Sequence, residues 1–149
     1  MYSRILIATD GSALANKGLE HGLTLAKSLG SEVTVLTVSE PWTPIGVDAT
    51  GFAATEYGLI EEYNKAMATS RRIILDSAEK TAAAMGLKVI TLYVAGQFPA
   101  DAIVQTAESQ GFDLIVMASH GRRGIGRVLL GSQAYAVATQ SHVPVLIVK

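Results

Sequence analysis

The sequence predicts an α/β fold in which a doubly wound, five-stranded parallel sheet carries helices on both faces. Five short apolar runs alternate along the chain with four segments of helical periodicity, an order typical of right-handed crossovers between parallel strands. The apolar runs lack polar alternation, as strands covered on both faces do. Composition agrees, because 49% of the 149 residues are hydrophobic and only 17% are charged. No internal boundary is visible, so we expect residues 1–149 to form a single domain.

In the N-terminal half, the apolar and β-branched run at 5–9 predicts the first strand. Asp10-Gly11-Ser12 follows it as a turn and helix N-cap. Apolar residues at spacings of three and four then predict a helix up to residue 29, ended by Gly30. A second strand is expected at 33–38. From 41 to 51 two prolines and the lack of a consistent period predict a long loop.

In the C-terminal half, helical periodicity at 59–85 ends at Gly86, and a third strand is expected at 87–94. Helices are predicted at 99–110 and 132–140, with the fourth strand at 114–118 between them. The fifth strand, Val143–Val148, has no charge before Lys149. At a sheet edge such a strand is an unprotected pairing surface, so we expect a homodimer that pairs through it.

Charge and cysteine content exclude several classes of function. The 12 basic and 13 acidic residues give a net charge of −1, so there is no overall field to recruit nucleic acid or an anionic membrane. Without cysteine the chain has no disulfide, thiolate metal site or cysteine nucleophile. The N-terminal apolar run is too short for a signal peptide or a membrane span. These features favour a cytoplasmic protein without nucleic-acid or membrane partners.

The segment 117–132 is the most informative, because it is glycine-rich and joins a buried strand to a helix. Parallel sheets bind ligands beyond the carboxyl ends of their strands, and a helix N-terminus favours an anion. Residues 1–113 carry a net charge of −5 and residues 114–149 a net charge of +4, with three arginines inside six residues of this segment. The pattern predicts an anion site, with a solvated turn as the alternative. Neither a Walker P-loop nor G-x-G-x-x-G is present.

Four blocks of sequence together resemble the universal stress protein family over essentially the whole chain: ILIATDGS, TVLTV, DLIVMASHGRRGIGRVLLGS and HVPVLIV. Nucleotide-binding members of that family share G-x2-G-x9-G-[ST]. Gly121, nine residues and Gly131-Ser132 match this motif, whereas Ala118 stands at the first glycine. The resemblance implies a Rossmann-like sheet with strand order 3-2-1-4-5, and it implies ATP as ligand, with Mg²⁺ arriving on the nucleotide.

The resemblance also assigns roles to residues. It places the ribose on Asp10 and the adenine against the backbone of Val38, with the pocket lined by Ala8, Thr9 and Met117. Gly121, Gly131, Ser132 and Gln133 would meet the phosphates, and Ala118 stands where the family's glycine lets the chain pass close to the ribose. From the residues alone, Asp10 is equally a turn and N-cap residue. The full set of expected nucleotide-binding residues is Ala8, Thr9, Asp10, Val38, Met117, Ala118, Gly121, Arg122, Gly131, Ser132 and Gln133.

The function expected from these features is that of an ATP-binding stress-response regulator, a homodimer in which nucleotide occupancy modulates the binding of an unknown protein partner. Hydrolysis is expected to be slow, because no residue is evident as a catalytic base. The alternatives are a slow ATPase or nucleotidyl-transfer enzyme that uses His120 and the arginines, and a nucleotide-free dimeric scaffold in which Ala118 has closed the pocket. A hydrolase triad is disfavoured because no G-x-S-x-G elbow occurs. No residue is predicted to ligate a metal, because His21 and His142 are isolated in the sequence.

Overall fold

The computed structural model describes residues 1–42, 53–121 and 130–149, with the backbone alone for residues 53–57. All strand pairs are parallel, and the strand order is β3-β2-β1-β4-β5. The predicted fold class and strand order are confirmed. In chain order the elements are β1 Arg4–Ala8, α1 Ala13–Leu29, β2 Glu32–Ser39, α2 Ala53–Ala84, β3 Ile90–Ala95, α3 Pro99–Ser109, β4 Leu114–Ala118, α4 Ser132–Gln140 and β5 Val145–Val148.

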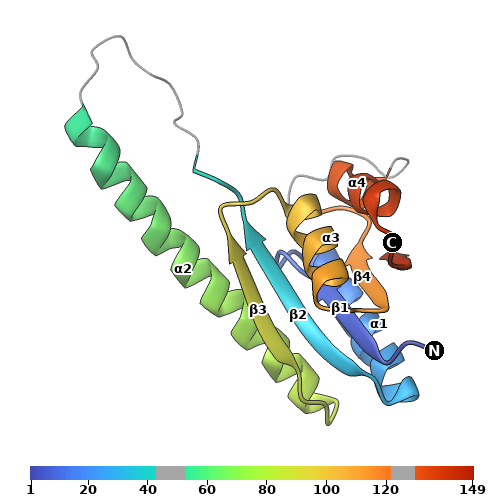
Figure 1. Ribbon diagram of the computed structural model, residues 1–149. Coiled ribbons are helices and arrows are strands. Elements are labelled where there is room, and N and C mark those ends of the chain that lie inside the picture. The colour runs from blue at the N-terminus through green and yellow to red at the C-terminus, as the bar shows by residue number, and fades with distance from the viewer. Residues whose placement is uncertain (43–52, 122–129) are drawn as a thin grey trace.

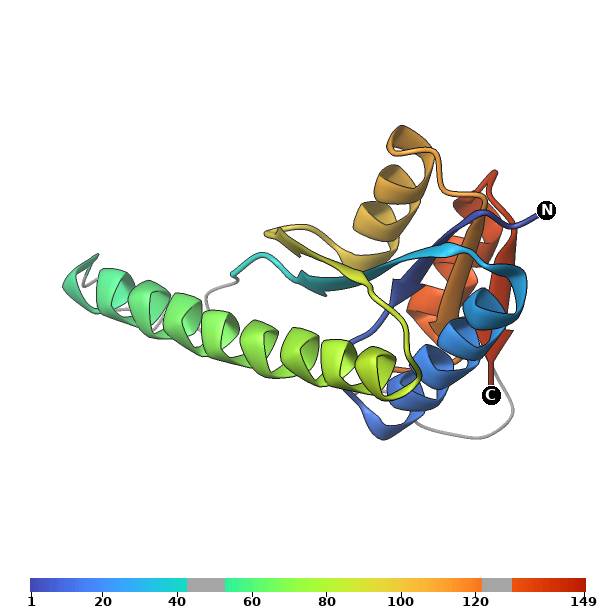
Figure 2. The ribbon, with the colours of Figure 1, turned by 90° about the horizontal axis from the view of Figure 1, so that it is seen from below.

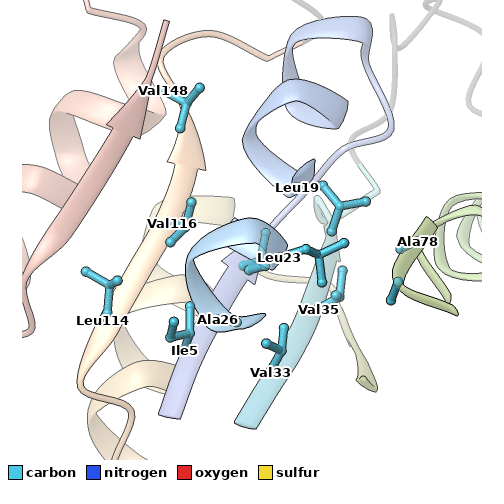
Figure 3. Packing of buried hydrophobic residues seen from close by; sticks show 12 residues of the cluster. Ile5, Leu19, Leu23, Ala26, Val33, Val35, Ala78, Leu114, Val116 and Val148 are labelled. Atoms are coloured by element: carbon cyan, nitrogen blue, oxygen red, sulfur yellow. The ribbon is translucent and has the colours of Figure 1, made fainter. Parts of the chain in front are cut away.

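The helices form two layers around the sheet. α1 and α2 cover one face, and α3 and α4 cover the other (Figures 1 and 2). The central strand β1 supplies both cores, because its side chains alternate between the faces: Ile5 and Ile7 point to α1, and Leu6 points to α3 and α4. Figure 3 shows the first of these cores, with Ile5 beneath Leu23 and Ala26 of α1. All three β1 side chains are fully buried.

α1 lies unusually close to the sheet because two of its buried positions are glycine. A Cβ built on Gly22 would stand 2.6 Å from the Ile7 side chain, and one on Gly18 would stand 3.3 Å from the backbone nitrogen of Ala118. The close approach lays α1 against β1 and β4. The first turn of α1 therefore sits beside the carboxyl ends of these two strands.

The structure corrects three predicted boundaries. α2 begins at Ala53 rather than at residue 59, and its N-terminal part projects beyond the sheet (Figures 1 and 2). β3 begins at Ile90 rather than at residue 87, because the Leu87 N–H still bonds to the Ala82 carbonyl at the end of α2. β5 begins at Val145 rather than at Val143, after Pro144, which has no N–H to donate to a ladder. Most of the predicted loop at 41–51 lies outside the described residues.

The part of the chain that the structure describes contains no helix that is both long enough and apolar enough to cross a membrane.

Candidate functional site

The carboxyl ends of β1 and β4 form the point at which the sheet reverses its winding. The two strands are neighbours, yet the chain leaves β1 towards α1 on one face and leaves β4 towards α4 on the other. In open α/β sheets a ligand crevice lies at such a point. Two helices of this protein begin there, α1 after Ser12 and α4 after Gly131. Both helix N-termini bring backbone N–H groups to the same edge.

The turn after β1 is held by its own side chains. The Ser12 N–H donates to Asp10 Oδ1 at 2.9 Å, and the Gly11 N–H donates to Thr9 Oγ1 at 3.2 Å. Gly11 adopts a φ of +76°, a left-handed conformation that suits glycine. Ser12 is the N-cap of α1, and its hydroxyl accepts the Ala15 N–H at 3.2 Å. The turn-and-cap interpretation of this segment is thus correct, with Ser12 as the cap.

Asp10 also reaches the loop after β4. Its Oδ2 atom lies where a side chain on Gly121 would be, since a Cβ built there would stand 2.6 Å from that oxygen. The two residues are more than a hundred positions apart in sequence. The carboxylate after β1 and the backbone after β4 therefore share one small space, and any side chain at position 121 would displace the Asp10 carboxylate.

Gly131 is held even more closely. Its N–H donates to the Ser119 carbonyl at 2.9 Å, and a Cβ at this position would lie 2.7 Å from the same oxygen and 3.3 Å from His120 Cα. These neighbours are backbone atoms, which cannot turn aside as a flexible side chain would. Glycine at position 131 thus allows the start of α4 to contact the end of β4 directly. Ser132, the first residue of α4, is exposed at that place.

Three of the residues expected to line the nucleotide pocket lie on the side of the sheet that α3 and α4 cover. Met117 is buried in the core beneath α3 and α4, and Ala8 and Val38 pack against the same core. Thr9 is buried at the end of β1, with its hydroxyl engaged by the Gly11 N–H. Ala118 is buried, and its backbone nitrogen faces Gly18 of α1. The structure therefore brings these predicted residues to the same end of the sheet.

Gln133 has a structural role that the sequence did not reveal. Its Oε1 accepts the Ala100 N–H at 2.9 Å, and so caps α3 from another helix. The N-cap residue of α3 is Phe98, whose side chain offers no acceptor. Serine or aspartate is usual at a helix N-cap, so the phenylalanine before Pro99 indicates that a residue from elsewhere in the chain must accept a hydrogen bond from the first turn of α3. Arg122, also in the predicted set, lies outside the described residues.

His120 and Ser119 form a contact at the end of β4. The Ser119 hydroxyl and His120 Nδ1 lie 3.1 Å apart, and Ser119 is buried. In the described residues no group of three or more His, Cys, Asp or Glu side chains is placed to hold a metal ion. Asp10 is the acidic side chain that the structure brings to Gly121.

Two cavities lie on the α1/α2 face. The larger, of about 630 Å³, lies between the start of α1 and α2, and Gly11 and Asn16 contribute to its wall together with Lys65 and Ile73. The smaller, of about 240 Å³, lies where β2 and β3 end. Of the predicted nucleotide-binding residues that the structure describes, none lines either cavity. The case for the crevice rests instead on the contacts of Asp10, Gly121 and Gly131.

Two carboxyl groups with shifted pKa values lie at the opposite, N-terminal edge of the sheet. Burial raises the pKa of Asp113, but hydrogen bonds from the Ser3 and Arg4 N–H groups and the Ser3 hydroxyl outweigh burial and hold this pKa below its ordinary value. The pKa of Glu108 is lowered by hydrogen bonds from the side chain and backbone of His142. Asp113 holds the starts of β1 and β4 together, and both carboxyl groups lie away from the crevice.

Comparison with known proteins identifies the family and supports the fold. The sequence pattern of the universal stress protein family matches residues 1–149. Universal stress protein MJ0531 of Methanocaldococcus jannaschii is 36% identical over 149 residues, which cover 100% of this chain and 83% of that protein. The solved structure of MJ0577 from the same organism has a TM-score of 0.78 at 32% identity, covering 100% of this chain and 96% of that one. A universal stress protein solved in complex with cAMP has a TM-score of 0.71 at 25% identity, covering 99% and 97%.

Proposed function

The chain belongs to the universal stress protein family, and we propose that it is an ATP-binding regulatory protein of the stress response. The observation that carries the proposal is the meeting of Asp10, Gly121 and the start of α4 at the switch point between β1 and β4. The relative solved with cAMP supports an adenine nucleotide as the ligand. We further propose that residues 1–149 act as one domain in the cytoplasm, without nucleic-acid or membrane partners.

In the proposed complex the ribose hydroxyls donate to Asp10, and the adenine lies towards Val38 and Met117. The phosphates lie at the N-terminus of α4, where free N–H groups and the helix dipole favour an anion. Gly121 and Gly131 serve by having no side chain in a space that the ligand and the backbone share. Mg²⁺ enters with the nucleotide, bound to its phosphates.

Nucleotide occupancy is proposed to act through the loop and helix that contact the phosphates. α4 packs against both α3 and β5, so a ligand at its first turn contacts an element that reaches the edge of the sheet. A change in the order of α4 upon binding would alter the surface that a protein partner meets. This places regulation in the binding step rather than in turnover.

Titration calorimetry with ATP, AMP and GTP in millimolar Mg²⁺ tests the proposed function. We expect ATP to bind, AMP to bind more weakly because it has fewer phosphates on α4, and GTP to bind more weakly because its base differs. Absence of both binding heat and a ligand-bound mass with ATP would overturn the proposal. A companion assay of phosphate release distinguishes a regulator from an ATPase. A regulator should release phosphate from ATP only slowly, whereas an ATPase should sustain release over many turnovers.

We propose that the protein is a homodimer paired through the edge strand β5. β5 pairs with β4 on one side and ends the sheet on the other, and Leu146 on it is 37% exposed. We expect Leu146→Lys to give monomers in sedimentation experiments, because a charge on the pairing edge opposes strand addition. Ile90→Lys is the matched control, on the opposite edge strand β3, where the side chain is 64% exposed. A dimer that survives Leu146→Lys would place the interface elsewhere.

A further inference from the structure

A small cavity lies between α2 and the carboxyl ends of β2 and β3. Its volume is about 240 Å³, below the roughly 300–1,000 Å³ of pockets for drug-sized ligands. Its walls are rich in aromatic side chains, with Trp42, Tyr63 and Tyr93 all half-buried. Among the described residues of its lining, Arg71 is the basic side chain and Glu40 the acidic one. The size suits a molecule with a single ring.

Hydrogen bonds between secondary-structure elements hold the walls of the cavity. The Tyr63 hydroxyl donates to the Glu40 carbonyl at 2.8 Å, which ties α2 to the end of β2. The Tyr93 hydroxyl and Ser39 Oγ lie 2.6 Å apart, which ties β3 to β2 below the helix. The two tyrosine rings are therefore held in place before any ligand arrives, and a preorganised site loses less entropy on binding.

Arg71 is held against an aromatic ring rather than in an ion pair with any described side chain. Its Cζ atom lies 4.4 Å from the centre of the Tyr93 ring, so the guanidinium is stacked on that ring. Among the described side chains no carboxylate is within ion-pair distance of it, and none of its contacts there is a hydrogen bond. A guanidinium has five N–H donors and matches a carboxylate with two parallel bonds. The donors at the wall thus suit a carboxylate.

The charge of the lining residues further restricts the class of ligand that fits the cavity. Glu40 also lines the cavity, so the formal charges of its described lining residues sum to zero, and a polyanion such as a triphosphate is not favoured there. A single carboxylate is favoured where it lies directly against the Arg71 guanidinium. The cavity is also separate from the nucleotide crevice. Its strand residues Ser39 and Tyr93 lie on the α2 side, while the neighbouring Val38 packs under α3 and α4 on the other side.

We propose that this cavity binds a small aromatic carboxylate. Arg71 holds the carboxylate, and the ring of the ligand lies among Trp42, Tyr63 and Met67. Simple aryl acids and aromatic amino acids both combine a ring with a carboxylate. Aromatic amino acids differ from simple aryl acids by their ammonium group. Trp42 reports on occupancy, because it is the single tryptophan of the chain and lines the cavity.

Trp42 emission is followed while the full chain is titrated with 3-phenylpropionate, phenylalanine, 2-phenylethylamine and acetate. We expect saturable quenching or enhancement with phenylpropionate, phenylalanine or both, and none with phenylethylamine or acetate. Arg71→Met should weaken that binding by about tenfold or more, since it removes the charged donors and keeps the apolar stem. Arg72→Met is the matched control: this neighbouring arginine is exposed and outside the lining, so affinity should be unchanged.

Three results would overturn the assignment: no response to either carboxylate, a response that Arg71→Met leaves intact, or a response to phenylethylamine alone. Adding ATP during the phenylpropionate titration separates the two sites. Competition would show that the cavity is part of the nucleotide crevice and would also overturn the proposal. Failure of ATP to bind, with phenylpropionate binding retained, would contradict only the proposed nucleotide function.

Discussion

An aspartate lies at each end of the central strand β1, Asp113 from the start of β4 and Asp10 from the turn after β1, and the two have different roles. At the N-terminal end Asp113 accepts the Ser3 N–H at 2.8 Å and the Arg4 N–H at 3.1 Å, so it fastens β1 to the start of β4. At the C-terminal end Asp10 accepts the Ser12 N–H and lies against Gly121. Side-chain hydrogen bonds join the strands at the N-terminal end of β1. At the C-terminal end, Gly121 and Gly131 leave space because they have no side chain.

Along this one strand, the N-terminal end contributes to the stability of the fold and the C-terminal end to the proposed nucleotide site. At the N-terminal edge Arg4 adds to the closure, because its Nη1 donates to the Gln110 carbonyl and its guanidinium lies 5.0 Å from the centre of the Phe112 ring. At the C-terminal edge the closest approaches are between backbone atoms, at Gly131 and Ser119. Substitutions at the first edge should therefore change folding, and substitutions at the second should change nucleotide affinity.

The largest effect is expected from Gly131→Ala. The new Cβ would stand 2.7 Å from the Ser119 carbonyl oxygen, so the start of α4 must shift. Overpacking of this kind costs about 1–3 kcal/mol. Because the shift moves the N–H groups of α4 away from the phosphates, we expect ATP affinity to drop roughly 10- to 100-fold. Calorimetry with ATP measures the loss. Gly58→Ala is the matched control, since nothing lies within 4 Å of a Cβ there; equal affinities for the two variants would contradict the phosphate assignment.

Asp10→Asn should reduce ATP affinity by about tenfold, because a ribose hydroxyl loses a charged acceptor. Stability should barely change. The asparagine Oδ1 can still accept the Ser12 N–H, so the turn before α1 is kept. Calorimetry measures the change in ATP affinity between the original chain and Asp10→Asn, and urea unfolding measures the change in stability. A variant that unfolds early yet binds ATP normally would reverse the roles given to the two ends of β1.

Asp113→Asn should lower the free energy of unfolding by about 1 kcal/mol, near the lower end for hydrogen bonds to a charged group because the carboxylate is close to solvent. ATP affinity should stay the same. The pKa of Asp113 is lowered in the fold from its ordinary value of 3.8. Its contribution is therefore fully present above pH 3.8 and is lost as pH falls through the lowered value.

Urea unfolding of both proteins at neutral pH and in acid provides the check on Asp113. The difference in stability between the original chain and Asp113→Asn should shrink in acid. A difference that grows in acid would have the wrong sign for a carboxylate whose pKa is lowered by folding.

The smallest effect is expected from Glu108→Gln. Glu108 and His142 lie 2.9 Å apart, but the histidine side chain is 91% exposed. Exposed ion pairs are screened and contribute little. Thermal unfolding should show no measurable change, although the pKa of Glu108 is lowered by its hydrogen bonds to His142. A clear loss of stability would mean that this pair also fastens the N-terminal edge.

Local patterns in the sequence were enough for the layers and the glycine spacing, and the resemblance to the universal stress protein family supplied the strand order. The runs at β1 and β4 are apolar throughout because both faces are covered, and the turn residues beside them mark where the helices begin. The nine residues between Gly121 and Gly131 matched a known family pattern, which gave the site its expected place.

Contacts between distant residues could not be predicted in this way. The Gln133 side chain caps α3 by accepting the Ala100 N–H, across 33 positions, and Asp113 binds Ser3 across 110. Such partners depend on how helices and strands meet after folding, and no local period encodes them. The stacking of Arg71 on Tyr93 is of the same kind, because it needs α2 to cross β3 at that point.

Amide chemical-shift mapping by NMR on addition of ATP compares the two ends of β1 in a single experiment. ATP should shift the amide signals of Gly11, Gly121, Gly131 and Ser132 at the C-terminal edge. It should leave those of Ser3, Arg4 and Asp113 at the N-terminal edge in place. Shifts confined to the N-terminal edge, or no shifts at Gly121 and Gly131 at saturating ATP, would contradict a nucleotide site between the ends of β1 and β4.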